Sequence, residues 1–264
     1  MRTFLIFAMA VLLIFSAFSC QMPEDRQAER ENPTFRAAER AYLSEQWNEA
    51  ITLYNRFLQL NPNTQIADEA VYYRGRAYLK KGSHQAAAHD FEYARAQGKT
   101  SHIRALATIG LAETYFALER YSEAIYLYKT ALAKYQSEIP ADEALYRIGV
   151  GQQRLGNWQE ASEAFTTLVK KYPSSDKAKD AARRIRLPGN FYSIQVGAFT
   201  NKSNADALAS RLQQAGFEPL ITTWDIEGQS WYYVRTGRFT KRTDAKVFEN
   251  RLIAAGFVDT QVYP

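Results

Sequence analysis

The sequence predicts a multi-domain protein: an all-α array of helix pairs followed by a small α+β domain of βαββαβ order. Two repeats support this prediction. Alanines recur every 37 residues through the middle of the chain, and two related segments lie 40 residues apart near its end. A repeat at a fixed period indicates a structural unit used more than once. A short apolar run at the N-terminus adds a targeting segment before the folded part.

Residues 1–20 have the features of a targeting segment. The apolar run ends at Phe18 and is shorter than the roughly 20 residues that a membrane-spanning helix needs. It leads into Ser19-Cys20, the only cysteine of the chain, and polar residues follow at once. This pattern resembles the lipobox of bacterial lipoproteins, whose cysteine is lipidated and becomes the new N-terminus. Ala17 stands where that family usually has leucine.

The lipobox resemblance implies a membrane anchor on Cys20. Gln21, in place of the aspartate that often marks inner-membrane retention, favours the periplasmic side of the outer membrane. The alternatives are an ordinary signal peptide, which would leave the protein in the periplasm, or an anchor in the inner membrane. Residues 21–30 are polar, and we expect them to form a tether.

A repeated pattern of alanine, aromatic and small residues predicts that residues 31–186 form the helical array. The recurring alanines are followed four residues later by a large aromatic, which places both on one helical face. A small residue also recurs on the preceding helix of each pair, and helices approach to about 8–10 Å only where such side chains meet. The three sets are Ala50, Ala87, Ala124 and Ala161; Tyr54, Phe91, Tyr128 and Phe165; and Ala38, Gly75, Ala112 and Gly149.

This pattern resembles the tetratricopeptide repeat over residues 31–175, in about four units. The usual period of that family is about 34 residues, and His84 replaces the aromatic of the second unit. The resemblance implies a concave surface that docks a partner protein, whose identity the sequence does not give. Candidate docking residues on the first helices are Arg74, Tyr78, Tyr115 and Arg147. The alternative interpretation places these tyrosines in the core between helices.

A basic segment closes the array: Lys177, Lys179, Arg183, Arg184 and Arg186. We interpret it as a solvated helix face; the alternative is contact with an anionic polymer or lipid. Leu187-Pro188-Gly189 then marks the boundary to the last domain, residues 189–264.

The last domain contains two matching segments, YSIQVGAF from Tyr192 and YYVRTGRF from Tyr232. We expect strands at 191–197, 218–225, 230–237 and 258–263 and helices at 203–215 and 243–255, which gives a four-stranded antiparallel sheet with both helices on one side. Because side chains alternate along a strand, one set should face the helices: Ile194, Val196, Tyr232 and Val234. Another should form an open outer face: Phe191, Ser193, Gln195, Trp231, Tyr233 and Arg235.

The two segments resemble the SPOR (sporulation-related repeat) domain over residues 189–264. Gln195 and Arg235 match its recurrent glutamine and arginine, whereas Tyr233 replaces a common arginine and Thr236 a common valine. The resemblance implies binding of peptidoglycan glycan strands, preferably those stripped of stem peptides. Aromatics on the outer face would stack on sugars, while Gln195 and Arg235 would bind hydroxyls, amides and free lactyl carboxylates. Alternatively, Trp231 and Tyr233 cover a loop or dock on the array.

We expect no enzyme activity, metal or cofactor. No nucleophile elbow, phosphate loop or zinc-protease motif occurs, and His84 and His89 are poorly spaced for ligation from one helical face. The RNA-recognition motif shares the βαββαβ order, but its aromatic signature is missing, and a net charge of +5 is mild, so we expect no nucleic-acid partner.

The expected function is an envelope protein that ties a membrane to the cell wall at division septa or sites of wall remodelling. The alternative is a repeat-type scaffold or outer-membrane assembly lipoprotein, in which the terminal domain only localises the protein or binds protein.

Overall fold

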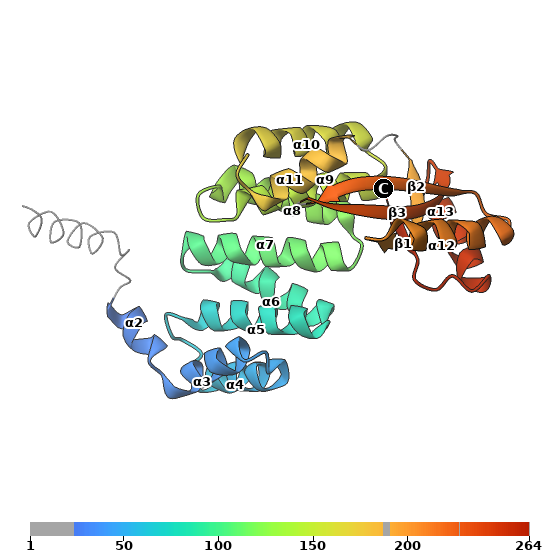
Figure 1. The fold of residues 1–264 in the computed structure, drawn as a ribbon. Helices are drawn as coiled ribbons and strands as arrows, with labels where there is room; N and C mark the ends of the chain where they lie inside the picture. The colour runs from blue at the N-terminus through green and yellow to red at the C-terminus, as the bar shows by residue number, and fades with distance from the viewer. Residues whose placement is uncertain (1–23, 187–190, 227, 264) are drawn as a thin grey trace, which may run out of the picture. The chain divides into compact units, whose positions relative to one another are not determined.

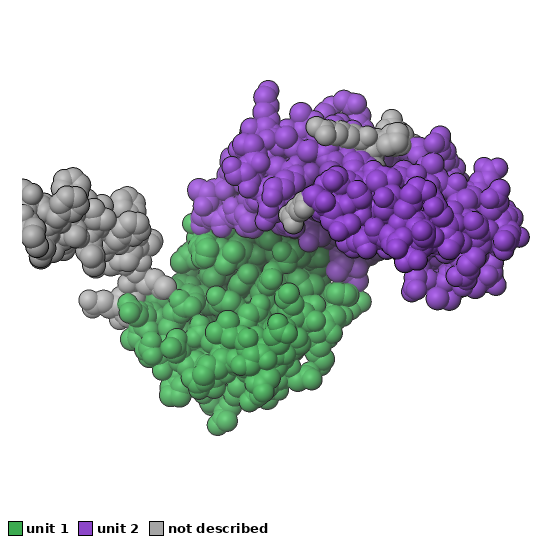
Figure 2. Space-filling view, viewed as in Figure 1, with its two compact units in different colours: residues 1–114 green, residues 115–264 purple. Residues whose placement is uncertain are grey.

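In the computed structural model of the protein, residues 24–186, 191–226 and 228–263 are described (Figure 1). The targeting segment, Cys20, Gln21 and the expected boundary at 187–189 lie outside these ranges. The chain divides into two compact units, residues 1–114 and 115–264 (Figure 2). Within the described ranges, no helix has the length and apolar character needed to cross a membrane.

The first unit is helical throughout its described part. Asn32 begins the first long helix by accepting hydrogen bonds from the N–H groups of Thr34 and Phe35, and Pro33 fits the first helical turn. Gly82 ends the fourth helix in the left-handed conformation, at φ 83°. The helices are α2 (Glu24–Arg30), α3 (Pro33–Leu43), α4 (Trp47–Leu60), α5 (Ala67–Lys81), α6 (His84–Gln97) and α7 (Ser101–Ala117), whose last residues belong to the second unit.

The predicted helix crossings are confirmed in this unit. Ala50 and Tyr54 are fully buried and pack with Ala38 in one core. A Cβ added at Gly75 would lie 3.1 Å from the ring of Phe91, so this crossing leaves little room for a larger side chain.

The expected tether is instead partly helical and joined to the fold. Arg26 on α2 is 5% exposed and donates hydrogen bonds to Glu69 at 2.8 Å and to Asp68 at 3.2 Å. Both carboxylates lie in the first turn of α5. The sequence suggested a tether because the segment is polar; the structure uses that polarity for ion pairs with residues distant in the chain.

The array continues in the second unit with α8 (Tyr121–Tyr135), α9 (Ala141–Leu155), α10 (Trp158–Lys171) and α11 (Asp176–Arg186). Phe165 and Ala161 are buried with Ala178 and Ala181 of α11, so α11 is part of the array's core. A Cβ at Gly149 would overlap the Phe165 ring, which confirms the predicted crossing.

The terminal domain has the predicted βαββαβ order. Its elements are β1 (Tyr192–Phe199), α12 (Lys202–Gln214), β2 (Pro219–Ile226), β3 (Gln229–Phe239), α13 (Arg242–Ala254) and β4 (Gln261–Tyr263). The sheet is antiparallel with strand order β2-β3-β1-β4. Ile194, Val196 and Val234 are buried with Leu212 and Leu252 of the helices, as predicted, and Tyr232 packs against this core.

Within the second unit, the terminal domain packs against the end of α9. The buried Tyr192 hydroxyl lies 3.0 Å from the Gln153 carbonyl and 3.1 Å from that of Arg154. Arg154 in turn donates to the carbonyl of Val262 at 3.0 Å. Arg242 of α13 forms two hydrogen bonds with Glu119, at 2.8 and 3.0 Å. The sheet and the last helices of the array therefore share several polar contacts.

Candidate functional site

Strand pairing fixes which side chains share the outer face of the sheet. Arg235 on β3 pairs with Gln195 on one side and with Leu220 on the other, and Tyr233 pairs with Thr222. Residues directly opposite each other on neighbouring strands point to the same face. The same pairing adds Ser193, Trp224, Trp231, Gln261 and Tyr263 to this face.

Arg235 is a buried cation on this face. It is 8% exposed, and its guanidinium lies 4.1 Å from the ring centroid of Tyr263 and 5.6 Å from that of Tyr233. Among the described residues it has no carboxylate partner, and its Nε has no hydrogen-bond partner. Burial lowers the pKa of Arg235, an effect that Tyr263 opposes. A buried cation without a counter-charge is unfavourable, and an anionic ligand would relieve that cost.

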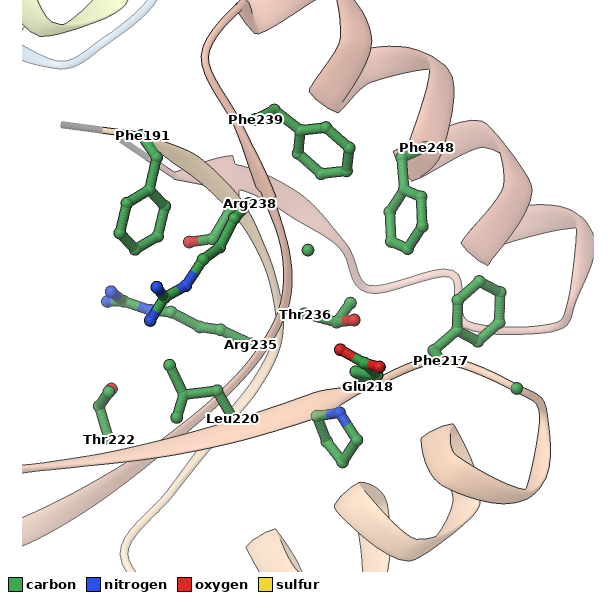
Figure 3. Close-up of a pocket in the computed structure, with 14 residues that line it drawn as sticks. Phe191, Phe217, Glu218, Leu220, Thr222, Arg235, Thr236, Arg238, Phe239 and Phe248 are labelled. Atoms are coloured by element: carbon green, nitrogen blue, oxygen red, sulfur yellow. The ribbon is translucent and has the colours of Figure 1, made fainter. Parts of the chain in front are cut away.

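One side of Arg235 opens into a hollow of about 630 Å³ (Figure 3). The guanidinium groups of Arg235 and Arg238 both extend toward Phe191, and that of Arg238 lies 4.7 Å from the Phe191 ring centroid. Thr222 lines the hollow on the side of Arg235, whereas Thr236 lies across β3 on the side of Phe217 and Phe248 (Figure 3); both hydroxyls are buried without a hydrogen-bond partner in the described structure. The hollow therefore combines positive charge, an aromatic wall and unused hydrogen-bonding groups, and its volume is within the usual 300–1,000 Å³ of ligand pockets.

The other side of Arg235 borders a smaller hollow, of about 190 Å³, between the sheet and α11. Arg183 and Arg184 of α11 line it, together with Gln195 and Tyr233 of the sheet. The outer face is thus partly covered by the array, which corrects the expectation of an open face. In the basic segment, Arg184 departs from the expected solvated helix face, since its side chain is only 13% exposed, whereas that of Lys179 is 67% exposed.

The predicted site residues divide between the two hollows. Phe191 and Ser193 line the larger one, Gln195 and Tyr233 line the smaller one, and Arg235 lines both. Trp231 lines neither; it pairs with Trp224 across β2 and β3.

Sequence reasoning missed Arg238 as a site residue. Gly237 has φ 77°, which interrupts the alternation of β3 and lets Arg238 point to the same side as Arg235 (Figure 3). The glycine before Arg238 was the available signal. Tyr263, whose ring contacts Arg235, was missed because β4 is short and its register is not readable from the sequence.

The candidate docking residues of the array are engaged within their own units. In the first unit, Arg74 donates to Asp90 at 2.8 and 2.6 Å and to Asn55 at 2.6 Å, while Tyr78 packs against the core.

In the second unit, Arg147 donates to Glu143 at 2.6 Å, and the Arg120 guanidinium lies 4.2 Å from the Tyr115 ring centroid. These contacts give the four residues structural roles; whether they also dock a partner stays a prediction. The described residues contain no group of three or more His, Cys, Asp or Glu side chains that could hold a metal ion.

Comparison with known proteins agrees with this architecture. Residues 188–263 match the SPOR domain, and residues 35–102, 74–139 and 143–175 match tetratricopeptide repeats. A tetratricopeptide repeat protein from Parabacteroides merdae has a similar structure, with a TM-score of 0.52 and 16% identity over 72% of this chain and 67% of that one. At this identity the likeness shows the fold alone.

Two further solved structures have lower scores. MamA gives a TM-score of 0.48 and 19% identity over 62% of this chain and 86% of its own. YrrB, described as a TPR protein with an unusual peptide-binding site, gives 0.45 and 20% over the same shares. No curated protein matches the sequence.

Proposed function

Because the chain belongs to the tetratricopeptide-repeat proteins and ends in a SPOR domain, we propose that it is a non-enzymatic protein of the cell envelope that binds peptidoglycan glycan strands. Both kinds of domain are binding modules, which fits peptidoglycan binding and protein interaction in general. The outer sheet face takes glycan strands stripped of stem peptides, and the repeat array docks a partner protein at division septa or sites of wall remodelling.

The buried guanidinium of Arg235, which has no carboxylate partner among the described residues, carries this proposal. Removal of stem peptides leaves free lactyl carboxylates on the glycan, and such a carboxylate supplies the counter-charge that Arg235 lacks. A hydrogen bond to a charged group is worth about 1.5–3 kcal/mol. Phe191 offers apolar area for a sugar ring, and the hydroxyl of Thr222, on the same side as Arg235, can bond sugar hydroxyls or acetamido groups.

The binding test is sedimentation of the full-length protein with amidase-treated glycan strands. We expect Arg235→Gln to weaken binding roughly 10- to 150-fold, the range that 1.5–3 kcal/mol implies. The matched control is Arg211→Gln, which removes the same charge from an exposed position on α12. Binding by Arg235→Gln equal to that of the control would overturn the glycan site.

The same assay addresses the alternative scaffold function. A wild-type protein that stays in the supernatant with stripped strands would favour this alternative, in which the terminal domain only localises the protein or binds protein.

The proposed location is the periplasmic side of the outer membrane, through a lipid on Cys20. Hydrophobic burial of acyl chains, about 0.8 kcal/mol per CH₂, would hold the protein there. Metabolic labelling with a fatty-acid probe tests this: Cys20→Ser should abolish the label, and a label that persists would refute the anchor.

A further inference from the structure

We propose that α11, the last helix of the array, forms part of the glycan site and selects strands with free carboxylates. This inference rests on the proposed function of the outer sheet face. It assigns the hollow between α11 and the sheet as a subsite for one carboxylate, in which Arg183 is a second ligand-binding cation beside Arg235.

The hollow has an excess of positive charge. Arg183, Arg184 and Arg235 line it, against one carboxylate, that of Asp180. Asp180 is already engaged: it accepts hydrogen bonds from Tyr146 and from Arg184, the latter at 2.9 Å. Although burial acts in the opposite direction, these partners keep the pKa of Asp180 below its ordinary value. One carboxylate thus serves several donors, and positive charge is left for a ligand.

The two arginines of α11 have different roles. Arg184 bonds Asp180 and, at 2.9 Å, the Gln153 side chain, and its guanidinium lies 5.5 Å from the ring centroid of Tyr263. Arg184 is therefore a positioning residue that holds α11 beside β4. Arg183 has a single 3.2 Å bond to Asp180, and its side chain is 37% exposed, so it can turn toward a ligand.

The volume of the hollow sets what can enter. At about 190 Å³ it is below the 300–1,000 Å³ of pockets that hold whole small ligands. It has room for one substituent, while the sugars lie in the larger hollow, and Arg235 borders both. A carboxylate still linked to a stem peptide loses its charge and carries a chain into the space covered by α11. The helix thus selects against unstripped strands.

The experiment compares two neutralised positions on α11 in the full-length protein. Arg183→Gln should weaken binding to stripped strands about tenfold, the loss of one charge-assisted bond, and should lower the preference for stripped over intact strands. The control Lys179→Gln removes the same charge from a side chain that is 67% exposed and does not line the hollow, and it should leave both quantities unchanged.

A chemical probe complements the variants. Stripped strands whose carboxylates have been converted to amides should bind wild type and Arg183→Gln equally, because the charge that Arg183 recognises is gone. Thermal unfolding of Arg183→Gln should match wild type, since its one bond is at the surface.

The outcomes separate this inference from the proposed function. If Arg183→Gln binds stripped strands as Lys179→Gln does while Arg235→Gln still binds them more weakly, the role of α11 is overturned and the sheet site remains intact. Tighter binding by Arg183→Gln also overturns it, because α11 would then obstruct the site. Unchanged binding by Arg235→Gln instead refutes the glycan site itself.

Discussion

The Tyr192 hydroxyl should be a main attachment between the terminal sheet and the array. The side chain is 1% exposed, and its hydroxyl lies between two carbonyls at the end of α9. Tyr192→Phe removes this hydroxyl and keeps the ring, whose centroid lies 5.1 Å from that of Trp158. The substitution therefore isolates the polar contact from the aromatic one.

The magnitude follows from the groups left behind. Without the hydroxyl, the Gln153 carbonyl would still accept a hydrogen bond from the Gly156 N–H, at 3.1 Å. The carbonyl of Arg154 is therefore the group that mainly loses a hydrogen-bond partner. A lost hydrogen bond costs about 0.5–1.5 kcal/mol, and a buried group left unsatisfied about 1–3 kcal/mol. We expect Tyr192→Phe to lower the free energy of unfolding by about 1–2 kcal/mol, or the melting temperature by about 2–8 °C for a unit of this size.

The assay is thermal and urea unfolding of the full-length protein. Tyr126→Phe is the matched control, because Tyr126 lies in the same unit and is 68% exposed; its effect should stay within about 0.5 kcal/mol. Equal unfolding midpoints for the two variants would show that the hydroxyl does not hold the sheet to α9.

Three further perturbations test the array and three tyrosines of the second unit. Gly149→Ala should cost about 1–3 kcal/mol in urea denaturation, since its methyl overlaps the Phe165 ring; wild-type stability would contradict that crossing. Asp90→Ala should cost about 3–5 kcal/mol, because it leaves Arg74 without its carboxylate partner. Asp176→Ala, at a side chain that is 95% exposed, should cost little, and equal losses for the two variants would be inconsistent with this reasoning. Burial raises the pKa of Tyr192 and of Tyr233, and it raises the pKa of Tyr146 to about 12. Because the folded state favours the neutral hydroxyls, their contribution to the free energy of unfolding is complete below about pH 10 and declines as the pH rises through the raised pKa values. Unfolding midpoints that remain constant between about pH 9 and 12 would argue against it.

Features specified by local periodicity were predictable from the sequence. Ala161 and Phe165 recur at helical spacing and are buried as expected, and the alternation around Ile194 placed the correct side of β1 against the helices. Such patterns recur along the chain, and each occurrence indicates that one face of a helix or strand is buried. The fold class followed from them, whereas both domain types came from the resemblance of the repeated segments to known families.

Contacts between distant segments were not predictable in this way. Arg26 pairs with Asp68, and Arg184 lies beside Tyr263; neither pair belongs to a common periodic pattern. The alternation of β3 therefore placed Arg235 on the outer face as a candidate site residue, but it did not predict the helix that covers part of this face. Within the candidate site, Arg238 points to the same side as Arg235 because Gly237 has a positive φ. Strict alternation along the strand would have placed Arg238 on the opposite side.

The ion pairs of Arg26 limit how far the array can lie from its point of attachment. Helix α2 begins at Glu24 and is joined to α5 by these ion pairs, and Cys20 precedes Glu24 by four positions in the sequence. Fully extended, that stretch spans at most about 14 Å. If Cys20 carries the lipid as proposed, the first helix pair is kept near the bilayer surface.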